Sequence, residues 1–190
     1  MNAPVFVLLG FLCGSVPVGF LVGKRKGINI QERGSGNIGF SNSLRIMGWK
    51  PGLLVLFGDV LKGYFPAAVA MHHFGLSNTA LFVSFAAVLG HVFSPWLRFK
   101  GGKGVATMMG VSLALCYPVA LIAAAAWLVI FFTWRTASIG SLAIPVLILA
   151  IVYWLEPRLI GFYVAVIALL LYSLRPNILR LIEGREPKIA

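Results

Sequence analysis

Glycine and basic residues alternate in the stretch from residue 98 to residue 107, Arg-Phe-Lys-Gly-Gly-Lys-Gly-Val-Ala-Thr. Glycine lets the backbone reach φ > 0, so the N–H groups of Gly101, Gly102 and Gly104 can converge on an anion. Lys100 and Lys103 add full charges, and the helix expected from Val105 adds the positive end of its dipole. The pattern predicts a phosphate-binding loop. A solvated basic loop that touches lipid headgroups is the alternative.

A second polar stretch covers residues 34–45, Gly-Ser-Gly-Asn-Ile-Gly-Phe-Ser-Asn-Ser-Leu-Arg. The spacing from Ser41 onward suits a short helix, which would place Asn42 and Arg45 on one face. An arginine binds phosphate in a bidentate fashion, and serine and asparagine side chains can position it. The stretch therefore predicts a second anion-binding loop, with a merely flexible loop as the alternative.

The composition places these loops in a membrane protein. The chain has 190 residues, of which 59% are hydrophobic and 11% are charged, against about 25% charged residues in soluble domains. The apolar residues form long runs, which predicts an all-α integral membrane protein with one domain over residues 1–190. The net charge of +11 does not indicate nucleic-acid binding, because the basic residues lie between the apolar runs rather than on one solvated face.

The apolar runs cover about residues 4–23, 51–71, 79–97, 105–134, 139–155 and 159–174. Gly14-Ser-Val-Pro17 predicts a bend in the first, and Tyr117-Pro118 interrupts the fourth. If the chain turns at Tyr117, there are seven spans, two of them short. All but two of the 16 lysines and arginines then lie on one side, since Arg158 lies opposite and Lys62 lies within a span. The positive-inside rule favours this arrangement, with the N-terminus outside and both loops and the C-terminus in the cytoplasm.

Three ionisable residues lie within predicted spans. Asp59 and Lys62, at i and i+3, are expected to pair, either as a structural ion pair or as the lining of a polar cleft. His91 lies near the inner end of its span, where a histidine is either functional or hydrogen-bonded structurally.

Several kinds of site are excluded. Residues 34–39 match G-x-G-x-x-G, but no strand precedes them, so a dinucleotide-binding fold is rejected. Lys103 is followed by glycine, so the P-loop pattern fails. The single aspartate in a span rules against a Ser-His-Asp triad, and no metal-ligand spacing occurs. An enzyme built this way would work by positioning and electrostatics on phosphate-rich substrates, without metal or cofactor.

Three motifs occur in order along the chain: residues 34–45, Gly90-His91 with residues 99–107, and Asn177-Ile-Leu-Arg180-Leu-Ile-Glu-Gly-Arg-Glu186. With these motifs the chain resembles the bacterial acyl-phosphate:glycerol-3-phosphate acyltransferases. Ser41 stands where the family usually has threonine, and Leu174 stands where it usually has histidine, so a role for that histidine is not carried over. The resemblance implies transfer of a fatty acyl group from acyl phosphate to the sn-1 hydroxyl of glycerol 3-phosphate. It also implies a bacterial inner-membrane location, an active site on the cytoplasmic face, and a soluble partner enzyme that makes acyl phosphate.

The resulting hypothesis is direct attack in a ternary complex. Ser35, Arg45 and Lys103 are the expected catalytic residues, and a substrate phosphate oxygen takes the hydroxyl proton, with His91 as the alternative base. The expected substrate-binding residues are Gly36, Asn37, Asn42, Lys100, Gly101, Gly102, Gly104, Thr107, Ser141, Asn177, Arg180 and Glu186, the last of which is expected to brace the tail against a basic loop. A phosphate or organophosphate transporter is the competing class, because glycine-interrupted helices and phosphate-binding loops occur there too.

Overall fold

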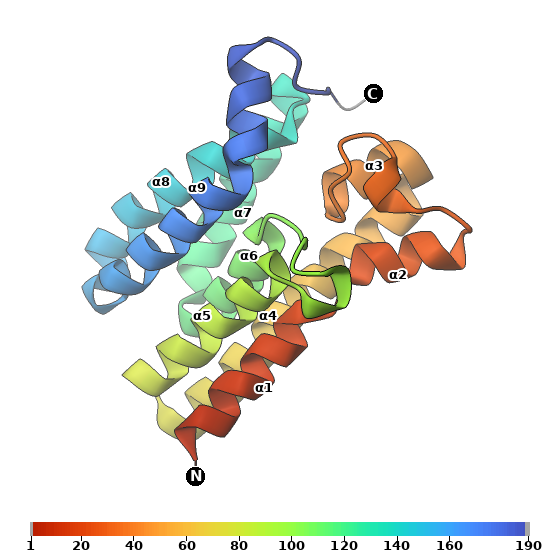
Figure 1. Ribbon diagram of the computed structural model, residues 1–190. Coiled ribbons are helices and arrows are strands. Elements are labelled where there is room, and N and C mark those ends of the chain that lie inside the picture. The colour runs from red at the N-terminus through yellow and green to blue at the C-terminus, as the bar shows by residue number, and fades with distance from the viewer. Residues whose placement is uncertain (1, 189–190) are drawn as a thin grey trace. The chain divides into compact units, whose positions relative to one another are not determined.

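The computed structural model describes residues 2–188, and every regular element in that range is a helix (Figure 1). The chain forms two compact units, an N-terminal unit that ends at Leu115 and a C-terminal unit that begins at Cys116. Within the described residues, six helical segments are long and apolar enough to cross a membrane. The prediction of an all-helical integral membrane protein is confirmed.

The N-terminal unit contains α1 (Ala3–Ser15), α2 (Val18–Arg25), α3 (Phe40–Met47), α4 (Trp49–Phe74), α5 (Asn78–Val92) and α6 (Val105–Leu115). Short 3₁₀ turns lie at Ile30–Glu32 and Pro95–Leu97. The bend predicted in the first span is the break between α1 and α2, where Pro17 has no backbone N–H to continue the hydrogen-bond ladder. The short helix predicted from Ser41 is α3, and α6 begins at Val105 as expected.

Glycines let α4 and α6 approach each other closely. A Cβ atom on Gly63 would overlap the backbone of Thr107, and one on Gly110 would overlap the backbone of Val60. Small residues of this kind let membrane helices pack backbone to backbone. The contact fixes α6, and therefore the loop before it, against the middle of α4.

The C-terminal unit contains α7 (Tyr117–Trp134), α8 (Ala137–Leu155), a 3₁₀ turn (Pro157–Leu159) and α9 (Ile160–Ile182). The predicted interruption at Tyr117-Pro118 is confirmed as a break between two helices, because α6 ends at Leu115 and proline occupies the first turn of α7. The prediction that the last helix ends near Leu174 is wrong. α9 continues through Pro176, since Leu170, Leu174 and Asn177 form one continuous buried face.

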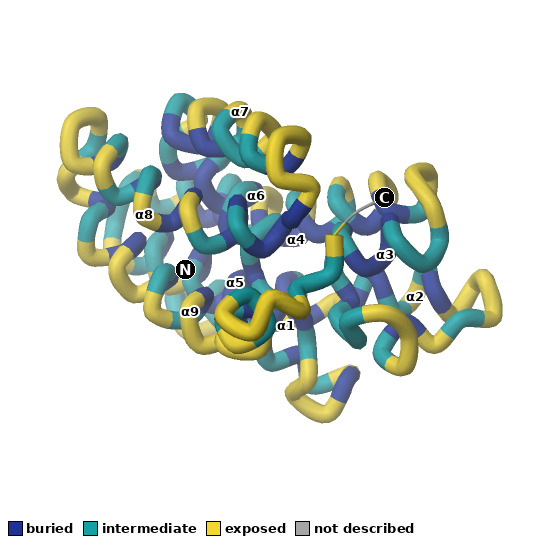
Figure 2. The backbone as a smooth tube through the Cα atoms, turned by 90° about the horizontal axis from the view of Figure 1, so that it is seen from above, coloured by how far each residue is buried: buried dark blue, intermediate teal, exposed yellow. Residues whose placement is uncertain are grey.

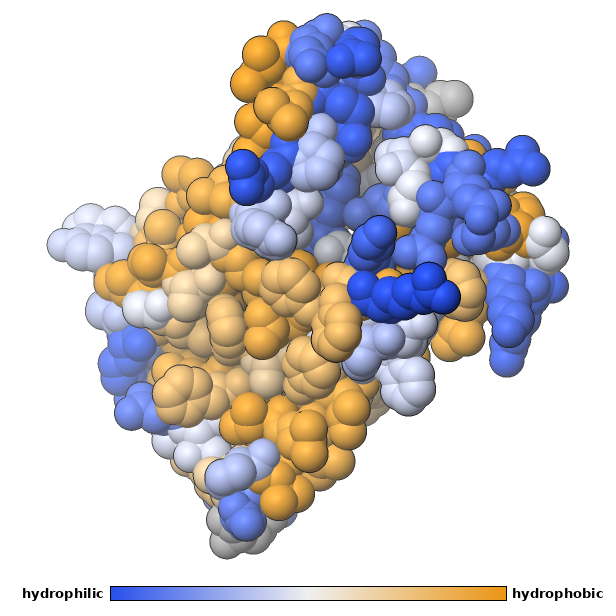
Figure 3. Space-filling view, viewed as in Figure 1, coloured by the Kyte–Doolittle hydropathy of each residue, from blue (hydrophilic) through white to orange (hydrophobic). Residues whose placement is uncertain are grey.

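Exposed apolar side chains cover the outer sides of the spanning helices, as expected of surfaces that face lipid. Along α7, buried residues are interspersed with exposed ones, so the helix has a buried side and an exposed side (Figure 2). Within the N-terminal unit, hydrophobic residues cover α1, whereas hydrophilic residues gather over α2 and α3 (Figure 3). The two glycine-rich stretches belong to this polar end.

Candidate functional site

Asn42 on α3 holds the first glycine loop, residues 33–39, in place. Its side chain is only 2% exposed. Its Nδ2 lies 3.3, 3.0 and 2.9 Å from the carbonyl oxygens of residues 30, 33 and 37, and its Oδ1 accepts a 2.9 Å hydrogen bond from the N–H of Ser35. Arg45 Nη1 lies 3.4 Å from the same Oδ1. Asn42 therefore brings Ser35 and Arg45 together, and its own hydrogen-bonding capacity is spent on the loop.

Three N–H groups within this loop, those of Ser35, Gly36 and Gly39, have local acceptors. Gly36 donates to the carbonyl of Arg33, and Gly39 donates to the side chain of Asn37. The Ser35 N–H is the one that Asn42 accepts. These three N–H groups are therefore not available to an anion. The side chain of Arg45 remains the strongest candidate for anion binding at this loop.

The second glycine loop, residues 98–104, covers the end of α5. Gly101 and Gly102 donate 3.0 Å hydrogen bonds to the carbonyls of Val92 and His91, respectively. Both positions exclude a side chain, since a Cβ on Gly102 would overlap His91 Nε2 and one on Gly101 would overlap the His91 carbonyl oxygen. These glycines satisfy the carbonyls that a helix end leaves unpaired. The predicted anion nest is therefore wrong for Gly101 and Gly102 as N–H donors.

The structure brings the two loops together. Gln31 Nε2 donates a 3.2 Å hydrogen bond to the carbonyl of Lys100, and Ile30, Ile38 and Leu97 form one buried cluster beneath them. Sequence reasoning missed Gln31, because a single polar residue in a loop carries no local signal of its distant partner. The two predicted anion-binding loops are thus neighbours.

The second glycine loop leads directly into α6, whose N-terminus can still bind an anion. Gly104 has φ +88°, which turns the chain into the helix. The helix N-terminus favours an anion, and the half-buried Lys103 precedes it by two residues. Thr107 lies in the first turn, fully buried, and its hydroxyl has no hydrogen-bond partner within the described structure.

Asp59, Lys62 and His91 form a buried polar cluster in the N-terminal unit. Lys62 Nζ lies 2.8 Å from Asp59 Oδ1 and donates a 2.7 Å hydrogen bond to the carbonyl of Val16, at the break between α1 and α2. His91 Nδ1 lies 3.6 Å from the same aspartate oxygen, and its side chain is 3% exposed. The predicted Asp59–Lys62 pair is confirmed. Its burial favours the structural interpretation over the lining of an open cleft.

The C-terminal unit has its own polar cluster around Glu186. Its Oε1 accepts hydrogen bonds from Ser138 (2.7 Å) and Asn177 (2.6 Å), and its Oε2 accepts one from Arg180 (2.8 Å). The prediction of a salt bridge to a basic loop is wrong, because Arg180 on α9 is the partner. Ser138 was not among the predicted site residues. Ser141, which was, donates instead to the carbonyl of Ala137 within α8.

Partial burial alone would raise the pKa of Glu186, but the hydrogen bonds from Ser138, Arg180 and Asn177 outweigh it and hold the pKa below the ordinary 4.5. Because the folded-state pKa is depressed, the stabilisation is complete above pH 4.5 and is lost as the pH falls through the lower folded value.

We expect the thermal midpoint in detergent to fall on acidification for the wild type and to change less for Glu186→Gln. Glu183→Gln, whose partner Arg185 is exposed, is the control and should follow the wild type. A Glu186→Gln curve parallel to the wild type would contradict this assignment.

No group of three or more His, Cys, Asp or Glu side chains suited to a metal ion occurs within residues 2–188. The N-terminal unit instead offers Ser35 and Arg45 at one loop and two lysines with a helix N-terminus at the adjoining loop. Such an arrangement can hold two phosphate groups and stabilise charge that develops on them.

Comparison with known proteins gives one consistent result. A model of the family described as glycerol-3-phosphate acyltransferase matches residues 4–184. A glycerol-3-phosphate acyltransferase of Aquifex aeolicus is 39% identical over 189 residues and 98% of both chains. One from Trichlorobacter lovleyi is 41% identical, over 99% of this chain and 98% of its own.

Among solved structures, the fold is similar to PlsY, an integral membrane glycerol 3-phosphate acyltransferase. Its glycerol 3-phosphate form has a TM-score of 0.95 and 37% identity over 100% of this chain and 96% of that one. Its lysophosphatidic acid form has a TM-score of 0.92 and 36% identity over the same shares.

Proposed function

The chain belongs to the glycerol-3-phosphate acyltransferase family, and we propose that it transfers a fatty acyl group from acyl phosphate to the sn-1 hydroxyl of glycerol 3-phosphate. The products are lysophosphatidic acid and inorganic phosphate, and the step is the first acylation of phospholipid biosynthesis. The observation that carries the proposal is the full-length similarity to a membrane acyltransferase solved in glycerol 3-phosphate and lysophosphatidic acid forms. These relatives give no support to the transporter alternative.

The proposed reaction is a direct attack. The sn-1 hydroxyl oxygen bonds to the acyl carbonyl carbon, the bond from that carbon to the phosphate oxygen breaks, and phosphate leaves. The hydroxyl proton passes to a phosphate oxygen. An acyl phosphate already has a good leaving group, so the protein needs no nucleophile of its own and contributes by positioning and by charge.

The geometry supports a division of roles between the two loops. Ser35, Asn37 and Arg45 hold the phosphate of the acyl donor, since Asn42 fixes Ser35 and Arg45 beside each other. Lys103, with Lys100 and Thr107, holds the phosphate of glycerol 3-phosphate at the start of α6. Gly36, Gly101, Gly102 and Gly104 shape the loops.

In the C-terminal unit, the residues proposed to bind substrate are Asn177, Arg180, Glu186 and Ser141. The Nε–H of Arg180 donates to Glu186. A guanidinium carries five N–H donors in all, so Arg180 has further donors with which to bind substrate.

His91 is proposed to position the second loop rather than to act as the base. Its imidazole is buried between Asp59 and Gly102. We expect His91→Asn to lower kcat modestly and to leave the shape of the pH–kcat profile unchanged. A loss of about 10³-fold in single-turnover assays, together with loss of a basic limb in the profile, would identify His91 as the base instead.

For the membrane arrangement we propose seven spans. They are the six longer segments and, in addition, the short apolar helix α6. The N-terminus lies outside, and the loops and the C-terminus lie on the cytoplasmic side of the bacterial inner membrane. The distribution of basic residues supports this. The proposal treats residues 1–190 as a single acyltransferase domain, and a soluble enzyme that makes acyl phosphate supplies the donor.

Product analysis tests the proposed function. Purified protein in detergent is given glycerol 3-phosphate with either palmitoyl phosphate or palmitoyl-coenzyme A, and the lysophosphatidic acid is analysed by mass spectrometry. We expect 1-acyl product from the acyl phosphate only. Product from the thioester at an equal rate, or mainly 2-acyl product, would contradict the proposal.

A further inference from the structure

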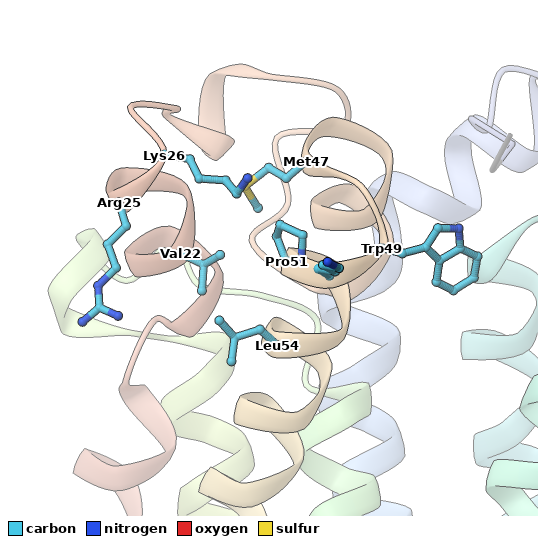
Figure 4. Close-up of a pocket in the computed structure, with 8 residues that line it drawn as sticks. Val22, Arg25, Lys26, Met47, Trp49, Pro51 and Leu54 are labelled. Carbon is cyan, nitrogen blue, oxygen red and sulfur yellow. The ribbon is translucent and has the colours of Figure 1, made fainter.

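A cavity of about 560 Å³ lies in the N-terminal unit between the end of α2 and the start of α4 (Figure 4). The proposed reaction uses none of its lining residues. They come from α2, α3 and α4 and the residues directly after α2, and they are Val22, Arg25, Lys26, Met47, Trp49, Lys50, Pro51 and Leu54.

The cavity is cationic. Arg25, Lys26 and Lys50 are all exposed, and none of the eight lining residues is acidic. The acidic residues of the N-terminal unit are Glu32 and Asp59. Asp59 is buried against Lys62, and Glu32 accepts a hydrogen bond from Asn29. Within the described part of the N-terminal unit, residues 2–115, the three cations therefore have no carboxylate partner at the cavity, and they favour an anionic occupant.

The other wall of the cavity is apolar. Val22, Met47, Pro51 and Leu54 contribute to it. In Figure 4, Leu54 extends from α4 toward α2, and Lys26 points from the end of α2 toward Met47. Trp49, with 51% of its surface exposed, stands at the first residue of a spanning helix, where tryptophan marks the boundary between hydrocarbon and headgroups. The cavity thus lies at headgroup depth, with a cationic rim and an apolar wall.

We propose that this cavity binds an anionic phospholipid of the surrounding bilayer. The phosphate group pairs with Arg25, Lys26 and Lys50, and an acyl chain covers the apolar wall formed by α2 and α4. A soluble phosphate compound would satisfy the cations but leave the apolar wall in water, and a zwitterionic lipid would satisfy the wall but only partly the cations. The proposal is separate from the acyl-transfer reaction and does not depend on it.

Native mass spectrometry of the purified full-length protein tests the proposal. The protein is titrated in detergent with phosphatidylglycerol, phosphatidylcholine, lysophosphatidic acid or inorganic phosphate. We expect phosphatidylglycerol to bind at least tenfold more tightly than phosphatidylcholine, and inorganic phosphate not to displace it. Since each basic side chain near an anionic lipid contributes about fivefold to affinity, the triple variant R25Q/K26Q/K50Q should lose up to about a hundredfold.

A charge-matched variant separates a specific site from general attraction. K24Q/R33Q/R98Q removes three exposed cations of the same unit that do not line the cavity, and it should keep the affinity of the wild type within about threefold. Equal losses in the two triple variants, equal affinity for the two phospholipids, or binding of lysophosphatidic acid alone would each overturn the proposal. All six substituted side chains are exposed, so both triple variants should fold like the wild type. Thermal unfolding of each variant checks this.

Discussion

Arg45→Ala should lower kcat/KM for acyl transfer by about 10²–10³-fold, the usual cost of removing a charge-stabilising donor from an active site. Asn42 holds Arg45 beside the N–H of Ser35, since both approach the same Asn42 oxygen at 3.4 and 2.9 Å. The guanidinium is proposed to stabilise the phosphate as it leaves, so the substitution should affect kcat at least as strongly as KM. Steady-state measurements with acyl phosphate and glycerol 3-phosphate as separate variables check the result.

Two further variants make the Arg45 experiment specific. Arg45→Lys keeps the charge but loses the two-pronged geometry, so it should recover only part of the rate. Arg33→Ala removes an exposed arginine at the start of the first glycine loop, directly before Gly34, and should retain nearly full activity. Comparable losses for Arg33→Ala and Arg45→Ala would show that the loop needs positive charge in general, and would contradict the role assigned to Arg45.

Lys62→Met should destabilise the protein by about 3–5 kcal/mol, because it leaves Asp59 buried without its partner. The pair is almost inaccessible, with side chains 5% and 2% exposed. The substitution also removes one of two donors to the Val16 carbonyl, which accepts hydrogen bonds from Lys62 Nζ and from the Val18 N–H. For a chain of this length, the loss corresponds to a fall of about 10 °C in the thermal midpoint. Thermal unfolding in detergent, followed by circular dichroism, measures it.

The double variant Asp59→Asn with Lys62→Met removes both charges and should recover much of the lost stability. Arg158→Gln breaks the exposed pair with Glu156 and should leave the midpoint nearly unchanged. If Lys62→Met and Arg158→Gln melt alike, the buried pair is not the structural element described here.

The helices could be predicted from sequence largely because apolar runs and prolines act locally. Tyr117-Pro118 marked the division between α6 and α7, and Gly14–Pro17 marked the break after α1. The end of α9 could not be predicted from hydropathy. Polar residues after Leu174 suggest a tail, but the buried face continues through Asn177, and only the packing of the C-terminal unit shows this.

The residues of the site were easier to predict than their partners. Glycines and lysines in residues 98–104 indicated a special backbone path, yet the N–H groups of Gly101 and Gly102 pair with the end of α5. The partner of Gln31 is 69 residues distant, at Lys100, and Ser138 on α8, which donates to Glu186, is 48 residues distant from it. Such pairings depend on which helices are neighbours, and no local pattern encodes that.

Phosphate release under single-turnover conditions tests the central claim most directly. Purified protein is mixed with a substoichiometric amount of palmitoyl phosphate, with and without glycerol 3-phosphate, and both inorganic phosphate and lysophosphatidic acid are followed. Direct transfer predicts that phosphate appears only when glycerol 3-phosphate is present, at the same rate as lysophosphatidic acid and in a one-to-one ratio. A burst of phosphate without glycerol 3-phosphate, leaving the acyl group on the protein, would contradict the account.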